Sequence, residues 1–406
     1  MTVDNTASAP PIVGSPHKIA ERQAPTWDFR SHPGKPLHEV ERPFYVDDDR
    51  TAFKHHEDDM KLQFSTDWNK VNQSSHEQSD VCMVYYPPSL DLSFDLDLED
   101  RLFRDLQEWS WFQCIPEYAI KQGLITARYC SLKADIRYEQ RAIIHHYLVW
   151  IFVMDAVSEQ LPLHGLHSTA GKVYLENLKS IMRDGPIEDM KRLFHGSCPD
   201  EVLDTAVLAQ RLLAEDILPL MRSILTPHHV QMCVETLDLF LDNQYYEGQQ
   251  YHSQPTSDVV MQTRAYTIGT MICALFYLPS SEAQLWNPND PLVIHMAISV
   301  AHFNDFMGMY KDRASLEKGG DASAGMNMVL LSMKEHQLSE HEALRHCAQK
   351  INVFLRQFEQ LSTSLMPDRQ RFYHHVLRGH FALYDFHLLG LKGKCNGRYG
   401  WRVHEM

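Results

Sequence analysis

An acidic pair stands directly after an apolar stretch of the sequence. The run 148–154 (LVWIFVM) is followed by Asp155 and, four residues later, by Glu159. In a helix these carboxylates share one face and are separated by about 6 Å of rise. A carboxylate that leaves an apolar core needs a partner or a metal ion, and hard oxygen donors at this spacing suit Mg²⁺. The alternative is that the apolar run ends there and both acids are solvated.

A second group of polar residues follows another apolar stretch. In the sequence NDFMGMYKD, Asn304, Gly308 and Asp312 stand at positions i, i+4 and i+8, so a helix presents them on one face. This group begins 149 residues after Asp155. The sequence RAYTIG begins at Arg264, 40 residues before Asn304, and the pair RY at 398–399 begins 94 residues after Asn304.

These motifs resemble those of the class I terpene cyclases. DAVSE is similar to the aspartate-rich DDxxD/E motif, and NDxxGxxKD to the second metal motif, NDxxSxxKE. RAYTIG resembles the diphosphate-sensing arginine with its linker and helix-break residues, and RY resembles the pair that closes over the diphosphate. The motifs occur in the family's order and at compatible spacing over about residues 90–406. Within the family, the chain looks like a divergent fungal sesquiterpene cyclase, with the α-humulene synthases of tropolone–sesquiterpenoid pathways as the suspected type.

The resemblance implies a role for each matching position. The implied metal positions, for about three Mg²⁺ ions, are Asp155, Glu159, Asn304, Gly308 and Asp312. The implied diphosphate-binding residues are Arg264, Lys311, Arg398 and Tyr399. The implied linker and effector residues are Thr267, Ile268 and Gly269. Aromatic candidates for the wall of an apolar cavity are Phe152, Phe276 and Phe303, although aromatics at helical spacing are equally explained as core.

Three positions depart from the family pattern. Ala156 replaces the second acid of the first motif, which in the family contacts the closing arginine, so Arg398 needs another acceptor. Gly308 replaces the hydroxyl ligand of the second motif, and Asp312 is one methylene shorter than the usual glutamate. These changes alter the metal site or mark a protein that has lost the chemistry.

The elements that must position these residues are helices. From about residue 99 the apolar period is helical, and Pro and Gly residues punctuate the connections. The expected helices are 99–110, 115–123, 136–161, 167–183, 187–195, 200–223, 228–247, 257–277, 291–312, 323–335, 338–363 and 367–390. The fold class is therefore all-α: one helical bundle over 81–406 around a central apolar cavity. Residues 1–80 are expected to form an irregular, partly disordered extension, and 90–98 (LDLSFDLDL) suits a strand or a loop.

Composition narrows the classes of partner. The chain has 406 residues with 38 Lys plus Arg and 53 Asp plus Glu, a formal net charge of −15. This balance argues against nucleic acid and against an anionic membrane surface. The eight cysteines form no CxxC pair, the N-terminus lacks the features of a secretory signal, and no apolar run is long enough to span a membrane, so a cytoplasmic location is expected. The 24 histidines show no zinc-binding spacing.

The predicted function is a Mg²⁺-dependent sesquiterpene cyclase that ionises farnesyl diphosphate and releases a cyclic hydrocarbon, with α-humulene as the suspected product. The rival is a non-catalytic or degenerate helical protein that binds a prenyl diphosphate. A second copy of the chain, in a homodimer, is the one protein partner considered. The chain length of the substrate and the mode of ring closure stay open.

Overall fold

The computed structural model describes residues 60–77, 81–85, 96–116, 119–120, 122–124, 126–127, 136–163, 169–250, 255–317, 322–388 and 402–404. Arg398 and Tyr399 lie outside the described residues, as do 1–59 of the expected extension and 90–95 of the stretch left as strand or loop. The remainder of that stretch, 96–98, begins a helix.

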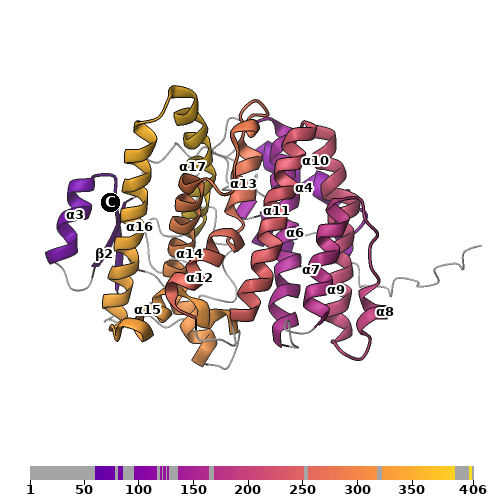
Figure 1. Cartoon of the computed structure of the whole chain (residues 1–406), viewed down its shortest axis with the longest axis horizontal. Helices are drawn as coiled ribbons and strands as arrows, with labels where there is room; N and C mark the ends of the chain where they lie inside the picture. The colour runs from indigo at the N-terminus through magenta and orange to yellow at the C-terminus, as the bar shows by residue number, and fades with distance from the viewer. Residues whose placement is uncertain are drawn as a thin grey trace, which may run out of the picture.

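Helices make up most of the described chain, and they stand side by side in one bundle (Figure 1). Those that match the expected helices to within a few residues are α4 (Leu96–Gln107), α6 (Tyr138–Leu163), α7 (Thr169–Met182), α8 (Met190–Phe194), α11 (Pro227–Gln250), α14 (Pro291–Glu317), α15 (Met328–His336), α16 (Glu340–Thr363) and α17 (Pro367–Leu388). Short 3₁₀ segments occur at Phe112–Cys114, Ala283–Leu285 and Ala322–Met326. The start of α16 shows the local cause clearly, because Ser339 and Glu342 form a reciprocal capping box.

Two of the expected helices are interrupted. The stretch 257–277 divides into α12 (Ser257–Thr267) and α13 (Thr270–Tyr277), because Gly269 takes a left-handed φ of 72°. The stretch 200–223 divides into α9 (Asp200–Arg211), a π-helical segment (Leu212–Ile217) and α10 (Leu218–Ile224). Pro219 near the start of α10 has no N–H to donate to the turn before it, which explains the wider segment there.

A small parallel sheet is the main difference from the all-α expectation. Strands β1 (Lys61–Ser65), β2 (Val81–Tyr85) and β3 (Arg402–His404) pair in the order β2-β1-β3, with α3 (Trp68–Glu77) between β1 and β2 in the chain. The five-residue runs KLQFS and VCMVY are too short for a clear period of two, and β3 comes from the far end of the sequence.

The sheet region packs on α16, at one side of the bundle in Figure 1. The amide of Tyr85 donates to Oδ1 of Asn352 at 2.7 Å, and Nδ2 of Asn352 donates to the carbonyl of Met83 at 2.9 Å. Trp68 stacks on Tyr85 with ring centroids 3.8 Å apart. Trp68 lies in the predicted extension, and its Nε1 also donates to Oε2 of Glu359 on α16 at 2.8 Å, so this part of the extension is tied to the helical body.

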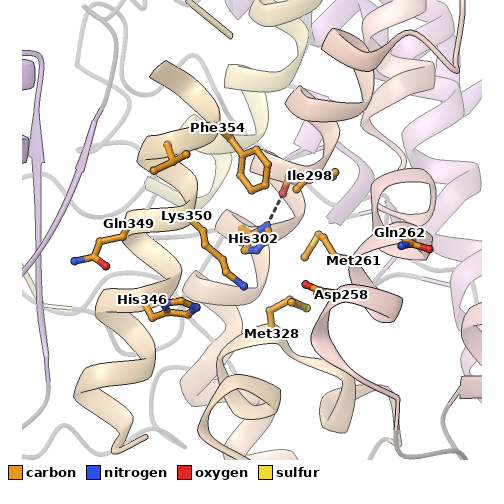
Figure 2. Close-up of a pocket in the computed structure, with 11 residues that line it drawn as sticks. Asp258, Met261, Gln262, Ile298, His302, Met328, His346, Gln349, Lys350 and Phe354 are labelled. Carbon is orange, nitrogen blue, oxygen red and sulfur yellow. Dashed lines mark hydrogen bonds between the residues drawn. The ribbon is translucent and has the colours of Figure 1, made fainter. Parts of the chain in front are cut away.

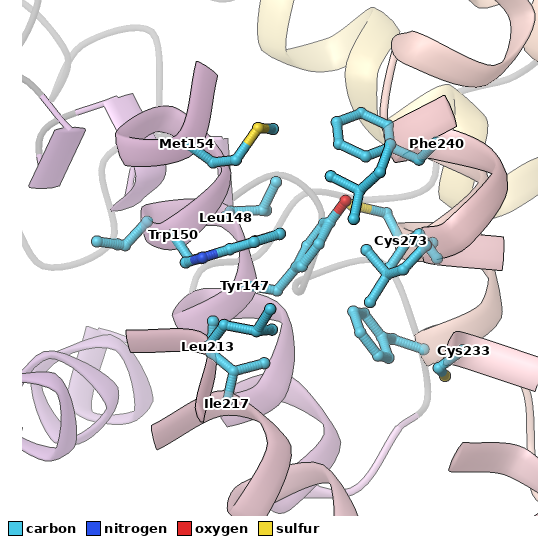
Figure 3. Close-up of a cluster of buried hydrophobic side chains, with 14 of the residues drawn as sticks. Tyr147, Leu148, Trp150, Met154, Leu213, Ile217, Cys233, Phe240 and Cys273 are labelled. Carbon is cyan, nitrogen blue, oxygen red and sulfur yellow. The ribbon is translucent and has the colours of Figure 1, made fainter. Parts of the chain in front are cut away.

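Two large groups of buried apolar side chains form the core. One, shown in part in Figure 3, joins α6, α7, α9, α11 and α13 and includes Tyr147, Trp150 and Phe276. The other joins α14, α16 and the strands and includes Phe303 and Phe306. The stretch Ser257–Tyr277 is long and apolar enough to span a membrane by composition, but it is broken at Gly269 and mostly buried in this core.

Candidate active site

A buried ion-pair network joins α12 to α14. Arg264, in the last turn of α12, donates from Nη1 to Oε1 of Glu247 on α11 at 3.1 Å, and from Nη2 to Oδ1 of Asp305 on α14. The side chains of Glu247 and Asp305 are 5% and 1% exposed. Two buried carboxylates around one guanidinium leave a local negative excess, which suits a site that takes up cations.

Asp305 holds the centre of this network. Its Oδ2 accepts the backbone N–H of Met328 at 3.1 Å, and its Oδ1 also accepts from Nδ2 of Asn304 at 3.3 Å. Asp305 therefore points into the protein and fixes Arg264, whereas Asn304 is only half-buried. Asp305 was not among the predicted site residues, although it stands beside Asn304 in the ND pair of the motif.

The rest of the α14 motif lies on one face, as its spacing predicted. A Cβ added at Gly308 would lie 3.2 Å from Oδ2 of Asp312. That oxygen accepts from Nδ2 of Asn327 at 2.8 Å, and Oδ1 of Asp312 pairs with the ammonium of Lys311 at 3.2 Å. Burial raises the pKa of Asp312, and the positive charge of Lys311 acts in the opposite direction.

Asn327 is a second residue that the sequence analysis missed. Its Oδ1 caps α15 by accepting the N–H of Val329 at 2.9 Å, while its Nδ2 also donates to the carbonyl of Asp305 at 2.7 Å. The only sequence signal is an asparagine before an apolar helical stretch, which indicates a helix start and nothing about the metal motif. Asn327 thus fastens the α14 motif to the neighbouring helix.

The first motif lies on the other side of the α12–α13 break. Tyr147, Ile151 and Asp155 stand at i, i+4 and i+8 on α6 and share a face. A Cβ at Gly269 would lie 2.9 Å from Cδ1 of Ile151 and 3.8 Å from the hydroxyl of Tyr147. Burial raises the pKa of Tyr147 well above its ordinary value, and the nearby Cys273, Cys233 and Asp155 act in the same direction. The face of α6 that carries Asp155 therefore lies against the break at Gly269.

Buried hydroxyls gather where α12 ends. The side-chain oxygens of Tyr147, Thr267 and Thr270 are buried and have no hydrogen-bond partner among the described residues. In Figure 3 the hydroxyl of Tyr147 points from α6 toward Cys273 on α13 and Phe240 on α11. Buried polar atoms without partners destabilise a fold, so a cluster of them marks a place where function or a ligand accounts for their presence. Tyr147 and Thr270 were not among the predicted site residues.

The aromatic cavity candidates belong to different buried groups. Phe276 contacts Tyr147 edge-on, with ring centroids 5.4 Å apart, and Phe152 is a half-buried neighbour of the same core group. Phe303 belongs to the other core group, with α16 and the strands. Whether these rings line one cavity therefore stays a prediction.

The donor set suits Mg²⁺. Asn304 and Asp312 supply hard oxygen atoms on one helix face, and the missing side chain of Gly308 leaves room for a ligand beside the Asp312 carboxylate. Glu159 lies in α6, and its side chain is outside the described part. Among the described residues, no group of three or more His, Cys, Asp or Glu side chains is close enough together to hold a metal ion. A metal at Asp312 would have to compete with Lys311 and Asn327 for its oxygens.

Comparison with known proteins defines the class. Residues 146–357 match the profile described as terpene synthase family 2, C-terminal metal binding. The (+)-bicyclogermacrene synthase of Penicillium expansum is 43% identical over 359 residues, which cover 88% of this chain and 92% of that protein. Among solved structures, 2-methylisoborneol synthase from Streptomyces coelicolor A3(2) is 14% identical with a TM-score of 0.58, covering 75% of this chain and 94% of that one. A variant of cucumene synthase has a TM-score of 0.50 at 15% identity, covering 73% and 97%.

The helical bundle has the class I terpene synthase fold. The chain belongs to terpene synthase family 2 and is a terpene synthase, a carbon–oxygen lyase that acts on phosphates.

Proposed function

We propose that this protein is a Mg²⁺-dependent sesquiterpene cyclase that converts farnesyl diphosphate to a cyclic hydrocarbon and diphosphate. The observation that carries the proposal is the position of Arg264. It lies in the last turn of α12, paired with Asp305 of the α14 motif, close to the break at Gly269 that the Asp155 face of α6 approaches. The relative from Penicillium expansum, named for a sesquiterpene product, supports the same substrate class.

In this proposal Asp155, Glu159, Asn304 and Asp312 hold Mg²⁺, with a water in place of the hydroxyl that Gly308 lacks. When bound, the ions offset the charge of the diphosphate and stabilise it as a leaving group. The Streptomyces coelicolor enzyme, which shares the fold, was solved in complex with Mg²⁺ and 2-fluoroneryl diphosphate.

Cationic side chains of the chain itself complete the diphosphate site. Arg264 already divides its guanidinium between two carboxylates, so a diphosphate oxygen can take the place of one of them as acceptor. Lys311, Arg398 and Tyr399 are proposed as the further donors. Because its ion pairs hold Arg264 in place before the C–O bond breaks, its guanidinium stabilises the charge that develops on the leaving group.

The apolar residues of α6 and α13 are proposed to stabilise the carbocation that forms after diphosphate leaves. The rings of Tyr147, Trp150 and Phe276 are buried close together, and aromatic faces stabilise a nearby cation by ~2 kcal/mol or more when water is absent. Exclusion of water also prevents capture of the cation as an alcohol. The product proposed from the sequence is α-humulene, whereas the Penicillium expansum relative is named for (+)-bicyclogermacrene.

The deciding experiment is incubation of the purified protein with farnesyl or geranylgeranyl diphosphate and Mg²⁺. Inorganic diphosphate and hydrocarbons are both measured, the latter by gas chromatography. Release of diphosphate together with a cyclic C15 hydrocarbon supports the proposal, and the chromatogram identifies the product. Binding of farnesyl diphosphate without release of diphosphate supports the rival, a non-catalytic prenyl-diphosphate-binding protein. Light scattering on the same sample tests the homodimer.

A further inference from the structure

A pocket lies apart from the proposed metal-binding and diphosphate-binding residues, none of which is among its lining residues. It has a volume of about 550 Å³ and opens between α12, α14, α15 and α16 (Figure 2). Volumes of roughly 300–1,000 Å³ are typical of ligand sites. Much of its wall is apolar, formed by Met261, Ile298, Met328, Val353 and Phe354.

His302 supplies the unsatisfied polar group of this pocket. Its Nδ1 lies 2.9 Å from the carbonyl of Ile298, as Figure 2 shows, and a carbonyl can only accept a hydrogen bond. Nδ1 therefore carries the proton, and Nε2 is an acceptor. The residue is only 2% exposed, and Nε2 has no partner among the described residues. The ring forms part of the pocket wall and its Nδ1 edge is committed to α14, so Nε2, which is itself buried, is the ring atom left to accept a hydrogen bond from a ligand.

The charges around the pocket favour a neutral ligand. Lys350 of α16 reaches into the pocket and makes no ion pair with any described residue, and Asp258 of α12 faces it from the opposite helix. One positive and one negative side chain leave no excess charge to hold a phosphate or a carboxylate. His346 and Gln349 add further polar edges. A hydroxyl group meets both polar requirements, because it donates to Nε2 of His302 and accepts from Lys350.

We propose that this pocket binds a neutral alcohol with a hydrocarbon body. The hydroxyl takes the polar end at His302 and Lys350, and the hydrocarbon covers the apolar wall. The pocket is coupled to the site already described, since Met328 lines it and its N–H donates to Asp305, the partner of Arg264. An occupied pocket thus stabilises the arrangement of Arg264. This coupling rests on the proposed function, whereas the binding does not.

Equilibrium dialysis of the full chain against labelled farnesol tests the ligand chemistry. Two compounds with the same carbon skeleton serve as comparisons: farnesene, which lacks the hydroxyl, and farnesyl monophosphate, which is an anion. We expect farnesol to bind about tenfold more tightly than farnesene, the difference made by one satisfied hydrogen-bonding group. Equal binding of farnesene would overturn the role of the hydroxyl, and tighter binding of the monophosphate would overturn the neutral ligand.

Substitutions in the pocket wall test whether farnesol binds in this pocket. Val353 lines the pocket and is 52% exposed, so Val353→Trp fills the space without disturbing the core. Val259, 45% exposed on α12 and outside the pocket lining, provides the same change as a control. We expect Val353→Trp and Lys350→Met each to weaken farnesol binding about tenfold or more, and Val259→Trp to leave it unchanged. Unchanged binding by Val353→Trp would place the alcohol elsewhere and end the proposal. The binding assay does not require turnover. Farnesol binding can therefore be confirmed even if the product assay detects no terpene, and the two proposals can fail independently.

Discussion

The two sides of the candidate site treat buried polar groups differently. On α14, the buried carboxylate of Asp305 accepts hydrogen bonds from Arg264, from Asn304 and from the N–H of Met328. On α6, His146 and Tyr147 are also buried, yet both ring nitrogens of His146 and the hydroxyl of Tyr147 have no partner among the described residues.

The two helices therefore stabilise buried polar groups in different ways: α14 pairs them, and α6 keeps them uncharged. The α14 side carries charge, so its carboxylates are held in place by hydrogen bonds before any ligand arrives. On α6, the stretch 146–154 that precedes Asp155 is mostly apolar and buried, and its buried polar groups stay neutral instead of being paired. Burial lowers the pKa of His146 to about 3 and raises that of Tyr147, so both are uncharged near neutral pH. The carboxylates of α14 are therefore held by ion pairs and hydrogen bonds, whereas His146 and Tyr147, which precede the proposed ligands Asp155 and Glu159 on α6, stay uncharged.

Loss of a proposed metal ligand is the largest expected effect. Asp155→Ala and Asn304→Ala should each lower product formation about a thousandfold, because each removes an oxygen donor worth several kcal/mol in the transition state. Diphosphate release by the folded variants is the measurement. Asp204→Ala removes an exposed carboxylate on α9 and should leave the rate unchanged. Full turnover by either ligand variant would contradict the metal assignment.

Removal of the central carboxylate should reduce stability. Asp305→Ala removes one of the two carboxylates paired with Arg264 and takes away the acceptor of the Met328 N–H. Breaking a buried pair in this way costs about 3 kcal/mol or more of unfolding free energy. Urea unfolding followed by circular dichroism measures the loss. Unfolding at the same urea concentration as the unaltered protein would show that the α14 network is not needed for the fold.

The α6 wall should make stability depend on pH. In the folded protein His146 stays neutral down to about pH 3, whereas in the unfolded chain it takes up a proton below about pH 6.5. The unfolding free energy should therefore fall as pH drops from about 6.5 toward 3, by at most ~1.4 kcal/mol per pH unit from this residue.

The variant His146→Phe keeps a ring against Trp109, which lies 4.3 Å away between centroids, and removes the titration. Urea unfolding at pH 7 and pH 5 should show a smaller difference for the variant than for the unaltered protein. The same difference in both would exclude His146 as a source of the acid sensitivity.

A change of product with little change of stability is expected for Tyr147→Phe. The hydroxyl has no described partner, so its removal should alter the unfolding free energy by less than about 1 kcal/mol. It is the polar atom of the wall that faces Cys273 and Phe240, so the hydrocarbon ratio should shift while diphosphate release keeps its rate. Tyr373→Phe is the matched control: its hydroxyl donates to Asp290, so stability should fall and the products should not change. An unaltered chromatogram for Tyr147→Phe would remove Tyr147 from the product-determining wall.

The smallest effect is expected from restoring the family's hydroxyl. In Gly308→Ser the new Cβ lies 3.2 Å from Oδ2 of Asp312, close enough that the carboxylate must shift by a few tenths of an ångström. Half-maximal activity should need less Mg²⁺, with stability within about 1 kcal/mol because serine also suits a helix better than glycine. Gly308→Ala adds the same Cβ without the oxygen. Equal Mg²⁺ requirements for the serine and alanine variants would show that no metal contacts this position.

The sequence predicted the α14 side of the site better than the α6 side. Helical spacing alone places Gly308 and Asp312 on one face, because that relation is local. Asn327 and Tyr147 could not be predicted, since their importance depends on which helices pack together. The break at Gly269 was expected only through the family resemblance, and the periodicity of 257–277 is that of one helix. The sheet was missed because its strands are short and its pairing is non-local.

Strand β3 shows that the N-terminal region has a structural role at the other end of the chain. Residues 402–404 pair with β1, a strand in the region set aside as an extension, and they follow Arg398 and Tyr399 by only a few positions. An expression fragment that began at α4 would keep every proposed metal ligand yet lose the neighbour to which the end of the chain is hydrogen-bonded. Shortened versions of this enzyme therefore risk a defect at the opposite terminus from the one that was cut.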